Sequence, residues 1–406
     1  MKNKKSLKDI IEKILEEMDE VKDFHAESLL QVLLTSLLNA IMRREREMHL
    51  EQVDDTKNGF YKRNFSIGSI PLILSIPRTR NSTFFPSILP KYSRTLPEEY
   101  RKLVEALLLS SRSIQSLKIA LSELNLPYSQ KEIEEITETL YQEFKAMNSR
   151  ELASDWLVIF MDAKVLDVKN EKGEIKKAVL ITATGIDMSG KKNFLGSHLH
   201  YGNETLEAWK IMLENLSQRG VKRVLLWVTD NFPGISKLIK SFFPLSMHQL
   251  CIVHLIRNAK YRLKKELYKR FREIVEMAGK AENFEEAEEI FSQGIDLIRK
   301  DHPHFAKELE RNQELYLTFT KFPREIRARI KSTNASENLH KELDKIRINS
   351  GGYFQSEKIL WVKWYIYLDN LQNNSWQKPE PVFKAHLQTL HLMFRKTFET
   401  EEINHE

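Results

Sequence analysis

The N-terminal part of the chain places its apolar residues at helical spacing. Between residues 6 and 52 they recur every three or four positions in two stretches, which predicts two amphipathic helices. Such helices could pack on each other, bind a second copy of the chain, or contact DNA directly. We therefore expect residues 1–56 to form a helical region that is a candidate for dimerisation. The apolar positions are Ile10, Ile11, Ile14 and Leu15 in the first helix and Leu29, Leu30, Leu33, Leu34, Leu37, Leu38 and Ile41 in the second.

The pattern changes at residue 57, where Gly, Pro, Ser and Asn are spread among short β-type runs such as FSIGSIPLILSIPRT. Helical periodicity returns over residues 98–147, in two segments separated by the turn NLPYS, and Ser129 with Glu132 forms a capping signal for the second segment. This order is that of a helix-turn-helix, but the glutamates of the second helix would repel phosphates, so a packing module is the alternative. We expect residues 57–150 to form a DNA-binding region.

Residues 151–254 alternate strands and helices. Three consecutive strands, a helix, a fourth strand, a second helix and a fifth strand follow one another, which is the order of a ribonuclease-H-like fold. The first and fourth strands are neighbours in that fold, and ligands gather at the ends of strands in such sheets. The predicted strands span residues 156–162, 178–187, 192–201, 223–230 and 246–253, and the predicted helices end at Gly220 and begin at Pro233.

The remainder of the chain is mainly helical. Residues 255–330 are highly charged and predict an all-α insertion, and residues 331–406 are expected to complete the core with a helix over 333–347 and further C-terminal helices. The predicted fold class is therefore α/β, with a ribonuclease-H-like core that contains an all-α insertion. A mainly helical N-terminal region with a small β segment precedes this core. The aromatic residues expected in the core of the C-terminal helices are Trp361, Trp364, Tyr365 and Tyr367.

Composition limits the class of protein. A chain of 406 residues with 41% apolar residues is long enough for two or three domains and is not wholly disordered. Cys251 is the only cysteine, which excludes an intrachain disulfide and argues against a zinc ribbon. The longest apolar stretch, residues 29–42, is too short and too polar to cross a bilayer, and the N-terminus lacks the apolar run of a signal peptide. We expect a soluble intracellular protein.

The charge distribution is compatible with a polyanionic partner. The formal net charge is +6, and between residues 60 and 102 eight Lys or Arg residues stand against two Glu residues, with aromatic residues interleaved. Such a segment suits phosphate contacts and base stacking, and a solvated hairpin face is the alternative. The candidate DNA-binding residues of this segment are Lys62, Arg63, Arg78, Arg80, Lys91 and Arg94.

Acidic residues in unlike contexts provide the candidate chemistry. Asp162 and Asp230 end apolar, β-type runs, whereas Glu337 lies inside a polar helical run. Carboxylate oxygens are the ligands that Mg²⁺ prefers, and a pair of metal ions can stabilise both the attacking and the leaving oxygen of a phosphodiester displacement. Taken singly, each carboxylate is also explained as a strand-end cap, a turn residue or a solvated helix residue. Their combination predicts a metal site only if the fold brings them together.

Several runs of the sequence together resemble the mutator-type transposases of bacterial insertion sequences, a branch of the DDE transposases. They are MDAKVLDV, KAVLITATGIDMSGKKNFLG, NLSQRGVKRVLLWVTDNFPG, FFPLSMHQLCIVHLIRN and KFPREIRARIKSTNASENLHKELDKIR. Their order and spacing match as well, with 67 residues between Asp162 and Asp230 and 106 between Asp230 and Glu337. The resemblance implies that these acids are the catalytic triad and the ligands of two Mg²⁺ ions, for which Mn²⁺ would substitute.

The resemblance also implies a substrate and an assembly. It implies an enzyme that cleaves and joins double-stranded DNA at the terminal inverted repeats of an insertion sequence and at target DNA. It further implies a homodimer on DNA, a cytoplasmic location associated with the nucleoid, and no membrane partner. The alternatives are a transposase-derived DNA-binding protein without catalysis, and a ribonuclease-H-like nuclease that cuts strands but never joins them.

One position departs from the family pattern, and one motif is left without a fixed role. The family usually carries a basic residue about seven positions after the last Glu, where this chain has Asp344. Lys341 and Lys345 lie one turn and just over two turns from Glu337, so either is a candidate to contact a phosphate instead. In the run CIVH, His254 with Cys251 is a candidate for active-site support, and packing and hydrogen bonding are the alternative role.

Overall fold

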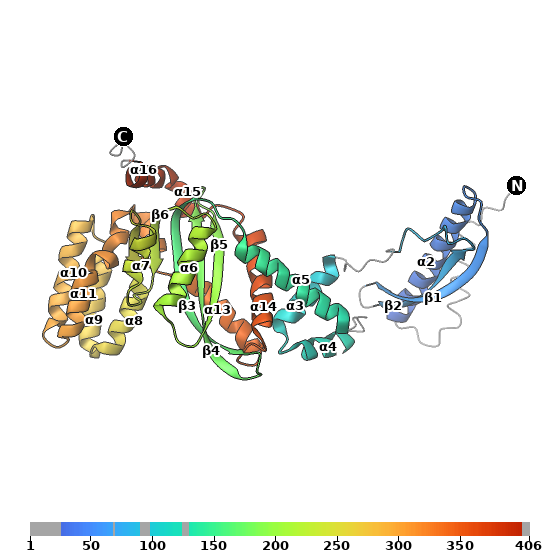
Figure 1. The fold of residues 1–406 in the computed structure, drawn as a ribbon, viewed down its shortest axis with the longest axis horizontal. Coiled ribbons are helices and arrows are strands. Elements are labelled where there is room, and N and C mark those ends of the chain that lie inside the picture. The colour runs from blue at the N-terminus through green and yellow to red at the C-terminus, as the bar shows by residue number, and fades with distance from the viewer. Residues whose placement is uncertain (1–25, 68–69, 90–97, 124–129, 400–406) are drawn as a thin grey trace. The chain divides into compact units, whose positions relative to one another are not determined.

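The computed structural model describes residues 26–67, 70–89, 98–123 and 130–399 (Figure 1). The helix predicted around Ile10 to Leu15 and the turn NLPYS lie outside these residues. The chain forms two compact units, residues 1–134 and 135–406, and each is described by itself. Among the described residues, no helix is both long and apolar enough to cross a membrane.

The first unit contains a helix packed on a β-hairpin. Helix α2 (Ala26–Leu50) lies against strands β1 (Lys57–Ile67) and β2 (Ile70–Thr79), which pair antiparallel. Leu38 and Met42 of α2 are buried against Leu72, Leu74 and Ile76 of β2. Alternation of buried and exposed residues along β2 follows from the period of two in a strand. The predicted helix and short β-type runs are therefore confirmed here.

Helices α3 (Glu98–Ser110) and α4 (Ile114–Glu123) follow, and α5 (Gln130–Ser149) runs into the second unit.

The second unit is built around a five-stranded sheet of order β5-β4-β3-β6-β7 (Figure 1). Strands β3 (Asp155–Lys169), β4 (Ile175–Asp187) and β5 (Lys192–Tyr201) form an antiparallel meander. The tight turn between β3 and β4 requires a left-handed residue, and Gly173 supplies it with φ +83°. Strand β6 (Arg223–Thr229) lies parallel to β3, and β7 (Met247–Leu250) lies parallel to β6.

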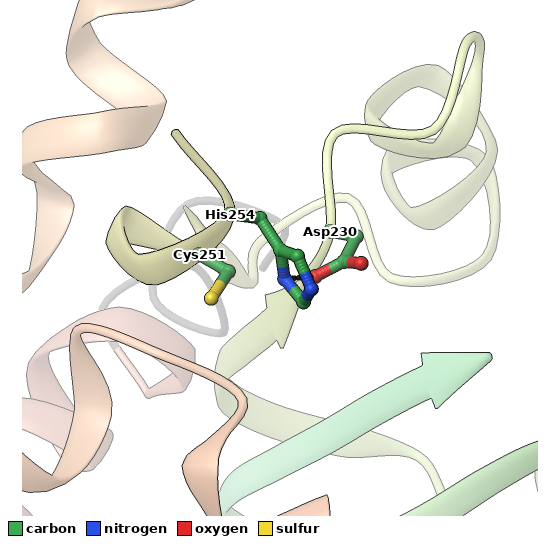
Figure 2. A group of neighbouring side chains, drawn as sticks. All are labelled: Asp230, Cys251 and His254. Atoms are coloured by element: carbon green, nitrogen blue, oxygen red, sulfur yellow. Dashed lines mark ion pairs between the residues drawn. The ribbon is translucent and has the colours of Figure 1, made fainter. Parts of the chain in front are cut away.

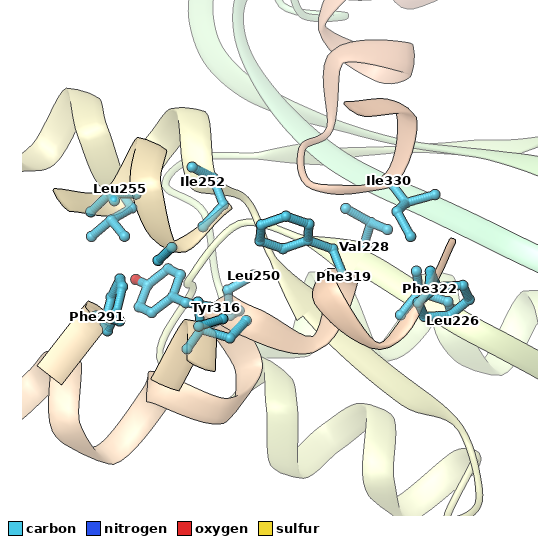
Figure 3. Packing of buried hydrophobic residues seen from close by; sticks show 14 of the residues in the cluster. Leu226, Val228, Leu250, Ile252, Leu255, Phe291, Tyr316, Phe319, Phe322 and Ile330 are labelled. Atoms are coloured by element: carbon cyan, nitrogen blue, oxygen red, sulfur yellow. The ribbon is translucent and has the colours of Figure 1, made fainter. Parts of the chain in front are cut away.

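Helices bury both faces of this sheet, because successive residues of β3 point to opposite sides. Ile159 and Met161 contribute to the core under α6 (Leu206–Gln218) and α7 (Ile235–Phe242). Val158 and Phe160 belong to a second core on the other face, which continues through Val228 and Leu250 into the helical insertion (Figure 3). The central strands are consequently almost wholly apolar, as expected for strands covered on both sides.

The insertion and the C-terminal segment supply the remaining helices. The insertion contains α8 (Ile252–Arg262), α9 (Lys265–Ala278), α10 (Phe284–Arg299), α11 (Pro303–Leu317), the 3-10 turn η1 (Thr318–Lys321) and α12 (Arg324–Ile330). The C-terminal segment contains α13 (Asn334–Asn349), α14 (Glu357–Asn370), the π turn η2 (Leu371–Ser375), α15 (Pro381–Ala385) and α16 (Leu387–Phe398). The aromatic residues of α14 are mostly core, as predicted: Trp364 is fully buried, and its indole nitrogen donates to Ser197 Oγ at 3.2 Å.

The structure corrects several predicted boundaries. The mixed α/β class is confirmed, but β3 continues seven residues past the predicted end at 162, because β4 pairs with it as far as Lys169. Asp162 therefore lies inside a strand and not at its end. The fifth strand stops at Leu250, and Cys251 is already the N-cap of α8. The helix expected to begin at Pro233 begins at Ile235, after Gly234 in the left-handed region.

Candidate active site

The register of two parallel strands brings Asp162 and Asp230 to the same level of the sheet. Phe160 of β3 pairs with Val228 of β6, so two residues further along each chain are Asp162 and Asp230. Asp162 is buried within β3, and Asp230 follows the last residue of β6. Glu337 lies in the first turn of α13, a helix that packs against β3 and β4. Residues from three distant parts of the chain thus lie close together where β6 ends beside β3.

His254 connects two of the predicted carboxylates. Its Nδ1 forms an ion pair with Oδ1 of Asp230, and its Nε2 lies 3.5 Å from Oε1 of Glu337. Figure 2 shows the imidazole of α8 directed at the Asp230 carboxylate, with the Cys251 thiol beside it. His254 is therefore at the site, in the first turn of the helix that follows β7.

Burial and neighbouring charges shift the pKa values of both Asp230 and His254. Burial raises the pKa of Asp230, the charges of Asp162 and Glu337 raise it further, and the contact with His254 opposes these effects without reversing them. Burial alone would lower the pKa of His254, but its contacts with Asp230 and Cys251 outweigh burial and raise this pKa to about 10. A proton is therefore held between the imidazole and the carboxylate at neutral pH.

Cys251 joins the end of the sheet to the helix that carries Glu337. Its backbone N–H donates to the Thr229 carbonyl at 2.8 Å. Its Sγ, which is buried, accepts from both the N–H and the hydroxyl of Thr333 at 3.5 Å. Thr333 is the N-cap of α13. The packing and hydrogen-bonding role that the sequence left open for Cys251 is therefore visible in the structure.

Arg257 and Glu204 also face the site, and the sequence reasoning missed both. Arg257, one turn after His254, places a guanidinium nitrogen 3.4 Å from Oε1 of Glu337 and remains half-exposed. Glu204 precedes α6 and accepts a 2.9 Å hydrogen bond from the indole of Trp209. Burial raises the pKa of Glu204, and Asp230 and Asp162 raise it further. The only sequence signal for Arg257 was its spacing of three residues from His254; Glu204 stands in an ordinary capping context.

His340 was missed as well, and it contacts Asp162 directly. Its Nδ1 lies 2.9 Å from Oδ2 of Asp162, and both side chains are buried. The signal was present, since His340 follows Glu337 by three residues and so shares its helix face. The sequence does not show, however, that the side chain of Asp162 points toward His340.

The position that departs from the family pattern is held in an ion pair. Asp344 of α13 pairs with Lys164 of β3, and it also accepts from Arg347 Nε at 3.2 Å. Burial would raise the pKa of Asp344, but these cations outweigh burial and lower it. Of the cations proposed from the sequence, Lys345 binds Glu342 at 2.5 Å and Lys341 is exposed.

The candidate DNA-binding residues of the first unit lie on the β-hairpin. Lys62, Arg78 and Arg80 are exposed, and Arg63 is half-buried. The Arg78 guanidinium lies 5.8 Å from the centre of the Tyr61 ring. Two arginines of α2 stack on Phe60, with Arg46 at 4.6 Å and Arg43 at 5.3 Å from the ring centre. Lys91 and Arg94 lie outside the described residues.

The donor set fits divalent cations that prefer oxygen. Asp162, Asp230 and Glu337 provide carboxylate oxygens. Burial raises the pKa of Asp230, the charges of Asp162 and Glu337 raise it further, and a bound cation would relieve that repulsion. Ligand atoms of Asp230, Cys251 and His254 also lie within 4.8 Å of one another. The Cys251 sulfur, however, already accepts from Thr333, so the carboxylates are the better-fitting ligands.

A family model and individual relatives of known name all indicate the same protein family. The sequence model of the family "Transposase, Mutator family" matches residues 1–378. The chain is 29% identical over 294 residues to the transposase for insertion sequence element IS905 of Lactococcus lactis, covering 72% of this chain and 73% of that one. It is 27% identical over 374 residues to the transposase for insertion sequence element ISRM3 of Rhizobium meliloti, covering 89% and 92%.

Among solved structures, the Drosophila P element transposase strand transfer complex aligns with 75% of this chain and 81% of that chain at 11% identity, with a TM-score of 0.30. A TM-score this low supports no conclusion about the fold or the function of this chain. The family match spans nearly the whole chain, including every residue of the site described above. The chain belongs to the Mutator family of transposases.

Proposed function

We propose that this chain is an insertion-sequence transposase of the DDE type, which cleaves and joins double-stranded DNA at terminal inverted repeats. Asp162, Asp230 and Glu337 are the proposed catalytic residues, and Mg²⁺ the proposed cofactor, with two ions per site. The observation that carries the proposal is the register of β3 and β6, which sets Asp162 level with Asp230, while His254 links Asp230 to Glu337.

The strand order supports a ribonuclease-H-like core. An antiparallel meander β5-β4-β3 continued by β6 and β7, each parallel to β3, has the order that the sequence predicted for this fold. Helices α8 to α12 interrupt the core between Asp230 and Glu337, at the place proposed for the all-α insertion. We also propose, from the sequence, that the N-terminal helical region ends at residue 56 and that the DNA-binding region ends at residue 150.

The residues of the site have separable tasks in the proposed reaction. Asp162, Asp230 and Glu337 would hold the Mg²⁺ ions, which supply Lewis-acid stabilisation of the attacking and departing oxygens when bound. The imidazole of His254 lies between Asp230 and Glu337, and its positive charge limits their repulsion in the metal-free protein. Arg257, half-exposed beside Glu337, is available to a phosphate oxygen. The reaction needs no covalent bond between protein and DNA, because water and then a DNA 3′-hydroxyl act as nucleophiles.

The first unit is the proposed reader of the DNA ends. Exposed Lys62, Arg78 and Arg80 on the hairpin would contact phosphates and so provide affinity that depends on salt concentration. Two element ends have to be held together, so we propose a homodimer on DNA. The stripe of exposed apolar residues along α2 supports its role as the interface. This stripe consists of Leu30, Leu37, Ile41 and Met48.

Substitution of Asp230 tests the proposed triad. Asp230→Asn keeps the size of the side chain, so it is expected to leave binding of a terminal-repeat duplex nearly unchanged and to abolish strand cleavage. Cleavage is measured on labelled DNA with Mg²⁺, Mn²⁺ or Zn²⁺, and joining is measured with a pre-cleaved end. Retained cleavage in Asp230→Asn would reject the triad. Cleavage without joining would favour the nuclease, and binding without either reaction in the wild type would favour the inactive DNA-binding protein.

A further inference from the structure

The strongest unassigned feature of the site is the buried contact between His340 and Asp162. The side chains of His340 and Asp162 are only 5% and 4% exposed, and His340 Nδ1 lies 2.9 Å from Asp162 Oδ2. The other oxygen of this carboxylate accepts from the N–H of Ala163 at 3.1 Å. The contact is an ion pair, in which His340 Nδ1 is the side that can carry the hydrogen, because a carboxylate accepts and does not donate.

The surroundings of His340 fix the direction of its ring. Leu339 and Leu343 flank it on α13 and are buried against the rest of the second unit, so the helix cannot turn without exposing them. The Nε2 atom is buried, and among the described residues it has no hydrogen-bond partner. A histidine kept here only to fill space would bury a polar ring at a cost that an apolar residue avoids. Among the described residues, the polar contact that His340 makes is its ion pair with Asp162.

We propose that His340 is a positioning residue, which fixes the Asp162 carboxylate for metal binding and couples its orientation to the helix that carries Glu337. The inference rests on the proposed function, since it takes Asp162 to be a metal ligand. Without His340, the carboxylate of Asp162 could rotate about its terminal bond, because the Ala163 N–H holds only one oxygen. Hydrogen-bond partners of metal ligands commonly contribute 10- to 100-fold to metal affinity.

The experiment compares variants of the full chain that differ in the donor but keep the bulk. His340→Leu removes the donor and fills the space, whereas His340→Asn retains an N–H donor close to the position of Nδ1. Binding of Mn²⁺ to the protein without DNA is measured by titration calorimetry, and cleavage is measured across a range of Mn²⁺ concentrations. We expect His340→Leu to weaken Mn²⁺ binding 10- to 100-fold and to recover cleavage at high Mn²⁺, and His340→Asn to stay within about threefold of the wild type.

A control on the same helix separates positioning from stability. Ile346→Ala removes buried side-chain atoms of α13 without touching Asp162, so it is expected to lower the free energy of unfolding and leave Mn²⁺ affinity unchanged. Unchanged affinity in His340→Leu would overturn the proposal, and so would an equal loss of affinity in Ile346→Ala. His340→Asn is a second test. A tenfold loss of Mn²⁺ affinity in this variant, which keeps an N–H donor, would show that the donor does not position Asp162.

Asp162→Asn distinguishes failure of this inference from failure of the proposed function. If Asp162→Asn loses Mn²⁺ binding and cleavage while His340→Leu keeps both, the triad stands and His340 has no positioning role. If Asp162→Asn keeps both, Asp162 is not a ligand and the proposed function itself is wrong.

Discussion

Lys164 and Asp344 form an ion pair between β3 and α13, two residues along the strand from Asp162. Residues 162 and 164 share one face of β3, because side chains alternate along a strand. About a third of each partner's side chain remains exposed, so solvent and a DNA phosphate can reach the pair. The family's basic residue is expected seven positions after Glu337, where α13 has Asp344. Lys164 of β3 places its positive charge against that position instead.

Replacement of Lys164 is expected to weaken DNA binding. Lys164→Gln should lower affinity for a terminal-repeat duplex about three- to tenfold and reduce the slope of log affinity against log salt by about 1, because one phosphate contact is lost. The measurement is fluorescence anisotropy across a salt series. Asp344→Asn frees the lysine and is expected to raise affinity. Loss of affinity in both variants would show that the pair is only structural, and a loss confined to Lys345→Gln would return the contact to the helix.

The proton held by His254 predicts a pH-dependent contribution to stability in the metal-free protein. Its pKa is raised to about 10 in the folded state, from an unfolded value near 6.5. The contribution is therefore complete below pH 6.5 and is lost as the pH rises toward 10. Against His254→Gln, the wild type is expected to be more stable by roughly 1–2 kcal/mol at pH 6, with a difference that shrinks toward pH 10.

Urea unfolding in EDTA at pH 6, 8 and 10 measures this difference. Exposed His304→Gln serves as the matched control and should show no such trend. A difference between wild type and His254→Gln that stays constant from pH 6 to pH 10 would contradict the assignment of the proton.

Arg327 is expected to hold the insertion together. Its buried guanidinium donates to the carbonyls of Thr320 and Ala281, both at 2.6 Å, and to those of Phe322 and Glu282 at 2.9 and 3.1 Å. Arg327→Met keeps the aliphatic stem but leaves these carbonyls without their donor, so the free energy of unfolding should fall by about 3 kcal/mol or more. Arg324→Met, which removes an exposed ion pair with Glu282, should cost less than about 1 kcal/mol. Equal costs in the two urea unfolding curves would disprove the role of Arg327.

The apolar stripe of α2 is expected to mediate dimerisation. Leu37 is 47% exposed, and it lies seven residues after Leu30 and four before Ile41, so these residues share one helix face. Leu37→Glu should convert the dimer into a monomer, because a charge at the centre of an apolar interface is not compensated. Light scattering after size-exclusion chromatography of the protein–DNA complex measures how many chains the complex contains. Ile73→Glu, at an exposed position of β2, is the control and should remain dimeric. A dimer that survives Leu37→Glu would place the interface elsewhere.

The sequence by itself determined most of the elements, because apolar periodicity is local, and it supplied the carboxylates that we propose as ligands. Apolar periodicity predicted α2, the meander β3 to β5, the strand β6 and the helical insertion, since a strand or helix buries its apolar face at a fixed period. It misplaced the end of β3 because the length of a strand depends on its partner: β4 extends the pairing to Lys169.

Only the tertiary structure decided which side chains meet. Lys164 and Asp344 are 180 residues apart, and Asp162 and His340 come from different elements with no shared pattern in the sequence. Such contacts depend on the rotation of α13 over the sheet, which is set by the packing of Leu339 and Leu343 and by the link from Cys251 to Thr333. Local periodicity carries no information about that rotation. The carboxylates that we propose as ligands could be named from the sequence, whereas the residues that contact them could not.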